Sequence, residues 1–169
     1  MDGELWEWVK SILIAVVLAF IIRLFVLEVF LVDGSSMEPT LQNRERLIVN
    51  KFQYFFQEPE HQDVLIFSFS NDRDFIKRVI GVPGDEVAIR DGQVFLNDTP
   101  LEEDYLREPT QGDYGPVSVP HDHLFVLGDN RNNSMDSRDP SVGFVTRENV
   151  KGKAFLVFWP LPSIRLINH

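Results

Sequence analysis

Residues 34–41, Gly-Ser-Ser-Met-Glu-Pro-Thr-Leu, lie where the chain changes character. A long apolar segment precedes them, and short runs of β-branched and aromatic residues follow. Gly34 permits a tight backbone turn and Pro39 fixes φ shortly afterwards, so a serine between them can be held at a surface bend with its N–H free. The same residue types form ordinary polar turns between strands. These eight residues therefore predict either a site for a nucleophile or a plain turn.

The apolar segment before this turn, residues 9–32, carries few charges. A membrane-spanning helix needs about 20 apolar residues. The segment reaches that length if Lys10 and Arg23 extend their charged ends towards water. We therefore expect a short polar N-terminal segment at 1–10 and a single transmembrane helix at 11–27.

Two other interpretations of this segment remain open. A buried core helix would have to cover apolar side chains on every face. A cleaved signal peptide would begin with basic residues, whereas Asp2, Glu4 and Glu7 outnumber Lys10. A retained anchor fits the residues better than either.

Downstream of the turn, the pattern predicts mostly strands. Asp91-Gly92 between two short runs is a hairpin signal, and Pro83-Gly84 closes another run as a type II turn. Residues 101–116 are acidic and contain several Pro and Gly, so we expect an excursion from the sheet with little order. The expected fold class is mainly β, with residues 28–169 forming an antiparallel sheet or barrel carried by one N-terminal helix. The predicted strands are 28–32, 46–52, 63–69, 75–82, 86–90, 93–97, 123–127 and 153–159.

Charge and cysteine content argue against several classes of function. The 169 residues carry a net charge of -10, whereas a nucleic-acid binder would show a basic stripe. The sequence has no cysteine, which excludes thiol nucleophiles, disulfide frameworks and zinc–cysteine sites.

The four histidines do not suggest a catalytic triad or a metal site. His61 lies in a charged turn, His121 and His123 precede or begin a strand, and His169 is the last residue. His121 and His123 can share one face of a strand, but no cluster supplies a third ligand. We expect solvated histidines, no metal and no cofactor.

A lysine is the other possible base. Lys77 lies in an apolar run, where it shares one face with Phe75 and Val79 while Arg78 faces the other side. A useful general base needs a pKa about 3 below the ordinary lysine value of about 10.4, and near-complete burial can supply that decrease. A cross-strand ion pair or an extended stem reaching solvent is the alternative.

The stretch 128–143 is polar although apolar strands bracket it. A calcium loop fails on spacing, because Arg131 and Ser134 occupy the third and sixth positions counted from Asp129. The remaining interpretations are a solvated loop or a folded-in polar network. In such a network Asp136 and Arg138 would form an ion pair, Asp129 would brace the loop, and Ser134 would hydrogen-bond a buried amine.

Three segments together resemble the motif boxes of bacterial type I signal peptidases. They are residues 34–41, residues 77–85 (Lys-Arg-Val-Ile-Gly-Val-Pro-Gly-Asp) and residues 128–138 (Gly-Asp-Asn-Arg-Asn-Asn-Ser-Met-Asp-Ser-Arg), in this order behind one apolar segment. The resemblance implies a serine endopeptidase with a Ser–Lys dyad. Ser36 matches the nucleophile that forms an acyl-enzyme, and neutral Lys77 matches the general base.

The resemblance also implies a supporting network. Ser134 matches the hydroxyl that orients the lysine, Asp136 and Arg138 match a salt bridge, and Asp129 matches a further brace. Gly34 departs from those members that carry a hydroxyl residue two positions before the nucleophile as a second oxyanion donor.

The implied substrates are secretory preproteins, cut after small residues at positions -1 and -3. The substrate would lie as an added strand beside residues 30–34. The implied location is the cell membrane, with the N-terminus in the cytoplasm and the β body outside, so the lipid bilayer is the second partner. The residues expected to line the cleft are Phe30, Val32, Met37, Leu41, Phe75 and Ile76.

Other functions remain to be weighed. A self-cleaving repressor or a pilin-processing enzyme also uses a serine and a lysine, but a repressor would carry a helix-turn-helix and no membrane anchor. A membrane-anchored binding module would leave Lys77 and Ser134 unexplained. We also expect Phe144, Trp159 and Leu161 to form an apolar rim against lipid.

Overall fold

The computed structural model describes residues 2–70 and 72–167, and gives only the backbone for Asp2 and residues 21–25. The predicted position of the Arg23 side chain and the environment of His169 therefore lie outside the described residues.

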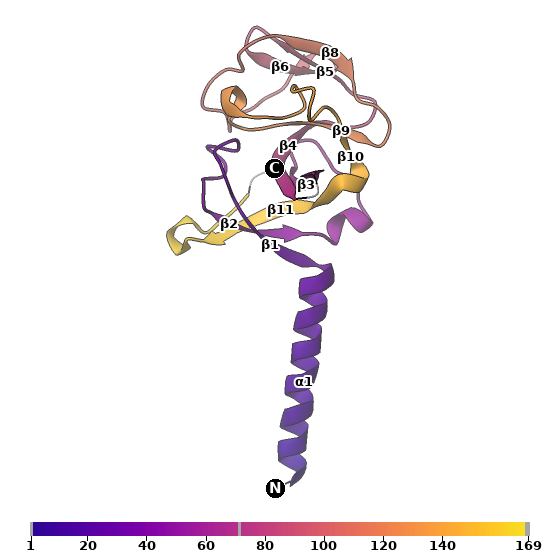
Figure 1. Cartoon of the computed structure of the whole chain (residues 1–169), viewed down its shortest axis with the longest axis vertical. Helices are drawn as coiled ribbons and strands as arrows, with labels where there is room; N and C mark the ends of the chain where they lie inside the picture. The colour runs from indigo at the N-terminus through magenta and orange to yellow at the C-terminus, as the bar shows by residue number, and fades with distance from the viewer. Residues whose placement is uncertain (1, 71, 168–169) are drawn as a thin grey trace.

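The N-terminal segment forms one helix, α1 (Asp2–Phe25), which projects from the β body (Figure 1). α1 begins before residue 11, where the predicted helix starts. It ends at Phe25, earlier than predicted, because Leu27 already pairs in the first strand. The side chains of residues 3–20 are exposed, so the β body does not cover them. The interpretation of this segment as a buried core helix is therefore wrong. In the part of the chain that the structure describes, no helix combines the length and apolar character needed to cross a membrane.

The larger of two sheets carries the site described below. Its strands pair antiparallel in the order β1-β2-β11-β3-β4-β9-β10, with β12 added beside β11. The bounds are β1 (Leu27–Leu31), β2 (Arg46–Asn50), β3 (Val64–Ser70), β4 (Arg73–Gly81), β9 (His123–Leu127), β10 (Val145–Thr146), β11 (Val150–Trp159) and β12 (Arg165–Leu166).

A smaller antiparallel sheet lies at the end of the body away from α1 (Figure 1). Its order is β7-β6-β5-β8, with bounds β5 (Glu86–Arg90), β6 (Gln93–Leu96), β7 (Thr99–Pro100) and β8 (Tyr114–Ser118). Four short 3-10 helices complete the elements: η1 (Gln53–Phe55), η2 (Arg131–Asn133), η3 (Arg147–Asn149) and η4 (Leu161–Ser163).

The mainly β, antiparallel architecture confirms the predicted fold class, and every predicted strand falls on an observed one. The interval 101–116 differs from the prediction. It ends in β8, and its earlier part contacts two buried arginines that require partners, Arg131 of the 128–138 loop and Arg78 of β4.

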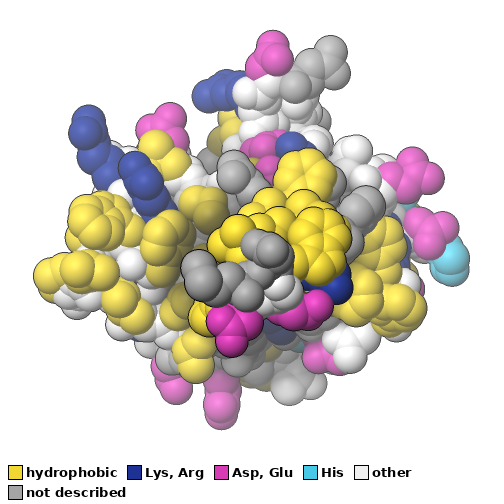
Figure 2. Space-filling view, turned by 90° about the horizontal axis from the view of Figure 1, so that it is seen from below, with side chains coloured by type: hydrophobic (Ala, Val, Ile, Leu, Met, Phe, Trp, Pro, Cys, Tyr) yellow, Lys and Arg dark blue, Asp and Glu magenta, His cyan; other side chains and the backbone are white. Residues whose placement is uncertain are grey.

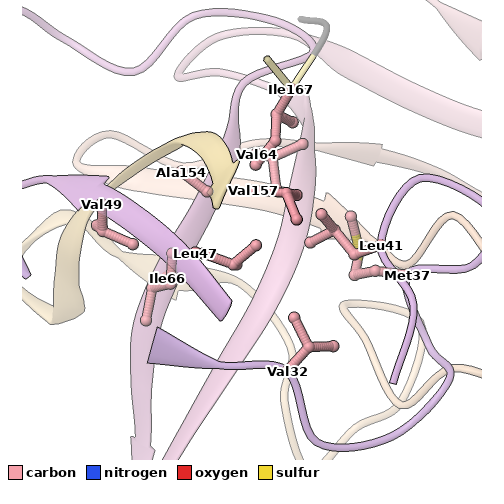
Figure 3. Close-up of a cluster of buried hydrophobic side chains, with 10 residues drawn as sticks. All are labelled: Val32, Met37, Leu41, Leu47, Val49, Val64, Ile66, Ala154, Val157 and Ile167. Atoms are coloured by element: carbon pink, nitrogen blue, oxygen red, sulfur yellow. The ribbon is translucent and has the colours of Figure 1, made fainter. Parts of the chain in front are cut away.

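One core cluster determines where the turn at 34–41 lies (Figure 3). Met37 and Leu41 are 2% and 0% exposed and pack with residues from β2, β3 and β11. The Leu41 N–H donates to the Met37 carbonyl at 2.9 Å, which closes one turn of backbone between them. Burial of an aliphatic side chain contributes about 1.5–3 kcal/mol, so these two residues anchor the turn on the body.

Candidate active site

Ser36 is presented by a turn that is fixed on both sides. Gly34 has φ +105°, a conformation that glycine adopts at little cost, and its N–H donates to Asn43 Oδ1 at 3.0 Å. The Ser36 carbonyl accepts a hydrogen bond from the Asn130 N–H at 3.0 Å. No hydrogen bond among the described residues uses the Ser36 N–H. The residue therefore has a fixed backbone, a partly exposed hydroxyl and a free N–H.

Lys77 on β4 meets this hydroxyl. Its side chain is buried, and Nζ lies 2.8 Å from Ser36 Oγ and donates to the Ile76 carbonyl at 3.0 Å. The Phe75 ring covers the amine, with its centroid 5.0 Å from Nζ. None of the ion pairs found among the described residues includes Lys77.

Burial lowers the pKa of Lys77 from 10.5 to about 8, while the nearby charges of Asp136 and Asp129 act in the opposite direction. Burial dominates because a charged amine loses its hydration in the protein interior. The difference corresponds to about 3 kcal/mol of preference for the neutral amine. At neutral pH about one molecule in ten then carries a lysine that can accept a proton.

The neighbouring cations Lys77 and Arg78 of β4 are both buried, although they face opposite sides of the strand. Arg78 is 1% exposed and binds Asp129 with two hydrogen bonds of 2.9 and 2.7 Å. Thr40 Oγ1 donates to the same carboxylate at 2.5 Å, which joins the turn that carries Ser36 to this pair. The predicted brace at Asp129 is thus present, and it acts on Arg78 and on the turn.

The 128–138 loop is a closed ring of hydrogen bonds and confirms the folded-in polar network. The Gly128 N–H donates to Asp136 Oδ2 at 3.0 Å, and Arg138 binds both oxygens of Asp136 at 2.8 Å. Arg138 also donates to the Arg131 carbonyl at 2.5 Å, and Arg131 Nε donates to the Gly128 carbonyl at 3.0 Å. The predicted Asp136–Arg138 ion pair is therefore present.

Ser134 is inside this loop but does not bond the amine. Its Oγ is buried and has no hydrogen-bond partner among the described residues. A Cβ at Gly128 would lie 2.2 Å from Ser134 Oγ and 2.5 Å from the Ser36 carbonyl oxygen. Only glycine allows this close approach, which places Ser134 next to the Ser36 backbone.

A groove of about 270 Å3 leads to Ser36 and Lys77. Five of the six residues expected to line a cleft do so, namely Phe30, Val32, Met37, Phe75 and Ile76. Leu41 does not, because it lies fully buried in the core behind the turn. Within the described residues, β1 pairs only with β2 on one side, and residues 73–77 of β4 pair only with β3 on the other, so two strand edges face the groove.

The histidines lie outside the groove. His61 Nε2 contacts Asp85 Oδ2 at 2.7 Å, and the exposed His121 pairs with Asp122. No group of three potential metal ligands occurs in the part of the chain that the structure describes.

Four residues of the network were not predicted from the sequence. They are Thr40, Arg78, Glu103 and Arg131. The alternation of side chains along β4 drew attention to Arg78, since it predicted that Lys77 and Arg78 lie on opposite faces of the strand. Thr40 bonds Asp129 across 89 positions and Glu103 bonds Arg131 across 28 positions, and no local pattern indicates such contacts.

Comparisons with known proteins agree on one family. Residues 5–159 match the family described as "Signal peptidase, peptidase S26". Similar curated proteins include a "Probable signal peptidase I-2" of Synechocystis sp., 47% identical over 94% of this chain and 75% of that protein, and a "Signal peptidase I" of Leptolyngbya laminosa, 44% identical over 95% and 82%. A crystal structure of a signal peptidase I from Enterococcus faecalis V583 is similar, with a TM-score of 0.51 and 34% identity, covering 57% of this chain and 97% of that one.

Proposed function

We propose a catalytic mechanism for this chain on one premise: it belongs to the signal peptidase family, peptidase S26. Relatives named signal peptidase I are 40–47% identical over most of the chain, and the chain is accordingly a hydrolase of that kind. The proposal is that it cleaves signal peptides from preproteins through Ser36 and neutral Lys77. The observation that carries it is the 2.8 Å contact between Lys77 Nζ and Ser36 Oγ at a buried amine without an ion-pair partner.

In the acylation step, neutral Lys77 accepts the hydroxyl proton of Ser36 while Oγ forms a bond to the scissile carbonyl carbon. The carbonyl electrons move to the oxygen and give a tetrahedral oxyanion. When this collapses, the C–N bond breaks, and the Lys77 ammonium returns its proton to the leaving amine of the mature protein. The product is an ester between Ser36 and the signal peptide.

In the deacylation step, the same amine takes a proton from water, which attacks the ester carbonyl. Collapse of the second oxyanion breaks the ester C–O bond, the Lys77 ammonium returns its proton to Ser36 Oγ, and the signal peptide leaves as a carboxylic acid that loses its proton to solvent. The free N–H of Ser36 is the oxyanion donor, because it lies at the nucleophile and has no other acceptor among the described residues. With Gly34 two positions earlier, no hydroxyl side chain is available there as a second donor.

The substrate fits as an extended strand between the facing edges of β1 and β4. Two strand edges can satisfy both sides of its backbone, whose alternate side chains then point into the groove. The groove is lined by Phe30, Val32, Met37, Phe75 and Ile76. We attribute the proposed specificity for small residues at -1 and -3 to the space that these side chains take up.

We further propose that α1 holds the enzyme in the membrane, with its N-terminus cytoplasmic and the body outside. Support comes from exposed apolar side chains along α1, such as Trp8 and Ile12. Figure 2 views the molecule from the side on which α1 projects and shows hydrophobic side chains on the body to either side of the helix. Trp159 and Leu161 are exposed and suit a lipid-facing rim, as does Phe56.

Phe144 does not belong to that rim. It is partly buried and packs on Phe125 and His123, with ring centroids 6.0 and 6.5 Å apart. The expectation that it faces lipid is wrong, because the small sheet and β9 enclose it.

The proposed mechanism is tested by cleavage of a purified preprotein in detergent or liposomes. Wild type should release the mature protein, and Ser36→Ala and Lys77→Ala should each be inactive while remaining folded. His61→Ala is the matched control for a base elsewhere and should cleave normally. Cleavage that survives Lys77→Ala would reject the dyad, and no cleavage by wild type would indicate a binding module instead.

A further inference from the structure

The interval between β7 and β8, residues 101–113, crosses from the small sheet to the 128–138 loop; we call it the strap. Its ends are tied to the small sheet, since the Leu101 N–H donates to the Val94 carbonyl at 2.9 Å and the Thr110 N–H to the Gly92 carbonyl at 3.0 Å. Between these ties the strap has no regular structure. Its position must therefore come from side-chain contacts.

The strongest of these contacts is a buried ion pair. Glu103 binds Arg131 through hydrogen bonds of 2.5 and 2.9 Å, and the two side chains are only 6% and 0% exposed. Thr110 Oγ1 accepts a further hydrogen bond from the same guanidinium at 3.2 Å. A buried guanidinium needs a carboxylate partner, and Glu103 is the one that contacts it among the described residues.

Tyr105 joins this pair to the second buried arginine. Its hydroxyl donates to Glu103 at 2.7 Å, and its ring centroid lies 4.0 Å from Cζ of Arg78. Burial raises the pKa of Tyr105, so the hydroxyl keeps its proton and remains a donor. The strap thus contacts both the Arg78–Asp129 pair and the Arg131 side chain.

Arg131 transmits this contact to the nucleophile. Its Nε holds the Gly128 carbonyl, and Gly128 lies so close to the Ser36 carbonyl that a methyl group would collide with it. The next residue but one, Asn130, donates its N–H to the same Ser36 carbonyl. A shift of Arg131 would therefore move the backbone that fixes Ser36.

We propose that Glu103 and Tyr105 are positioning residues for the peptidase reaction, acting through Arg131 on the backbone that holds Ser36. This inference rests on the proposed function. None of the residues that line the groove comes from the strap. Removing the contacts of Glu103 or Tyr105 should therefore slow the chemistry without weakening substrate binding.

The first test compares Glu103→Gln with Glu102→Gln in steady-state cleavage of a peptide substrate. Glu102 is the exposed neighbour on the same strap and serves as the matched control. Glu103→Gln should lower kcat by about tenfold or more with KM within about twofold, because an interaction beyond the groove is lost. Glu103→Asp, which keeps the charge, should recover part of kcat.

The pH profile supplies a readout that general loss of stability would not move. Lys77 faces Ser36 from the turn, Phe75 from its own strand, and the carboxylates of Asp129 and Asp136 from the loop. Loosening the loop admits water to the amine. The acid limb of kcat should then shift to higher pH in Glu103→Gln and not in the control.

A double-mutant cycle tests the route through Arg131. Glu103→Gln in an Arg131→Met background should cause no further loss of kcat, because the residue through which it acts is already gone. Additive losses would overturn the inference, as would a kcat of Glu103→Gln equal to that of Glu102→Gln.

Tyr105→Phe keeps the ring and removes only the hydroxyl, so it provides a milder variant if Glu103→Gln does not fold. Tyr105→Phe should lower kcat in the same way but by less. An unchanged kcat would contradict the positioning role proposed for the strap. Failure of wild type and Glu102→Gln to cleave at all would instead reject the proposed function.

Discussion

Lowering the pH should inactivate the enzyme by protonating Lys77, with a midpoint near the pKa of about 8. With that value, about one-tenth of the amine is neutral at pH 7 and about one-hundredth at pH 6. Because only the neutral amine accepts the Ser36 proton, kcat/KM should fall about tenfold for each pH unit below the midpoint and level off above pH about 9. An ordinary lysine with a pKa of 10.5 would instead leave the rate rising up to pH about 10.

The assay is the initial rate of cleavage of an internally quenched peptide with alanine at -1 and -3, measured from pH 5 to 10. Circular dichroism at each pH verifies that the protein stays folded. A midpoint near 10 would show that burial does not depress the pKa of this amine. Loss of cleavage in His61→Ala together with activity in Lys77→Ala would move the base to a histidine.

Three further substitutions test the buried charges and the close packing. Lys77→Met should have a Tm several degrees higher than wild type at pH 7, because folded wild type must then bury a charged amine. Between pH 8 and 10.5 the unfolded lysine binds more protons than the folded one, so the free energy of unfolding of wild type rises with pH. The difference of about 3 kcal/mol in free energy of unfolding between the two proteins should therefore close through that window. Gly128→Ala should reduce kcat by about a hundredfold, measured on peptide substrate, because its methyl group would displace the Ser36 carbonyl. Asp129→Asn should lower the free energy of urea unfolding by about 3–5 kcal/mol, since it leaves Arg78 buried without its carboxylate.

Some features of this protein follow from local sequence. The positions of eight of the twelve described strands were predictable because alternation and turn residues act over a few positions, and Asp91-Gly92 marks its hairpin. Local sequence raised the possibility that Lys77 is buried, but it left an ion pair or a stem reaching solvent open, and the structure decides for burial. The pairing of Ser36 with Lys77, 41 positions apart, was indicated by resemblance to a family and not by any local pattern.

Other features depend on contacts between distant segments. The sequence gives no reason for Glu103 to lie on Arg131, for Phe144 to face inward or for Leu41 to leave the groove wall. Each of these depends on how the two sheets and the intervening loops pack. The residue types along the chain determined where most strands form; only the tertiary structure decided which cations lost their hydration and which partner each buried charge found, because such partners are selected by space and desolvation rather than by spacing in the sequence.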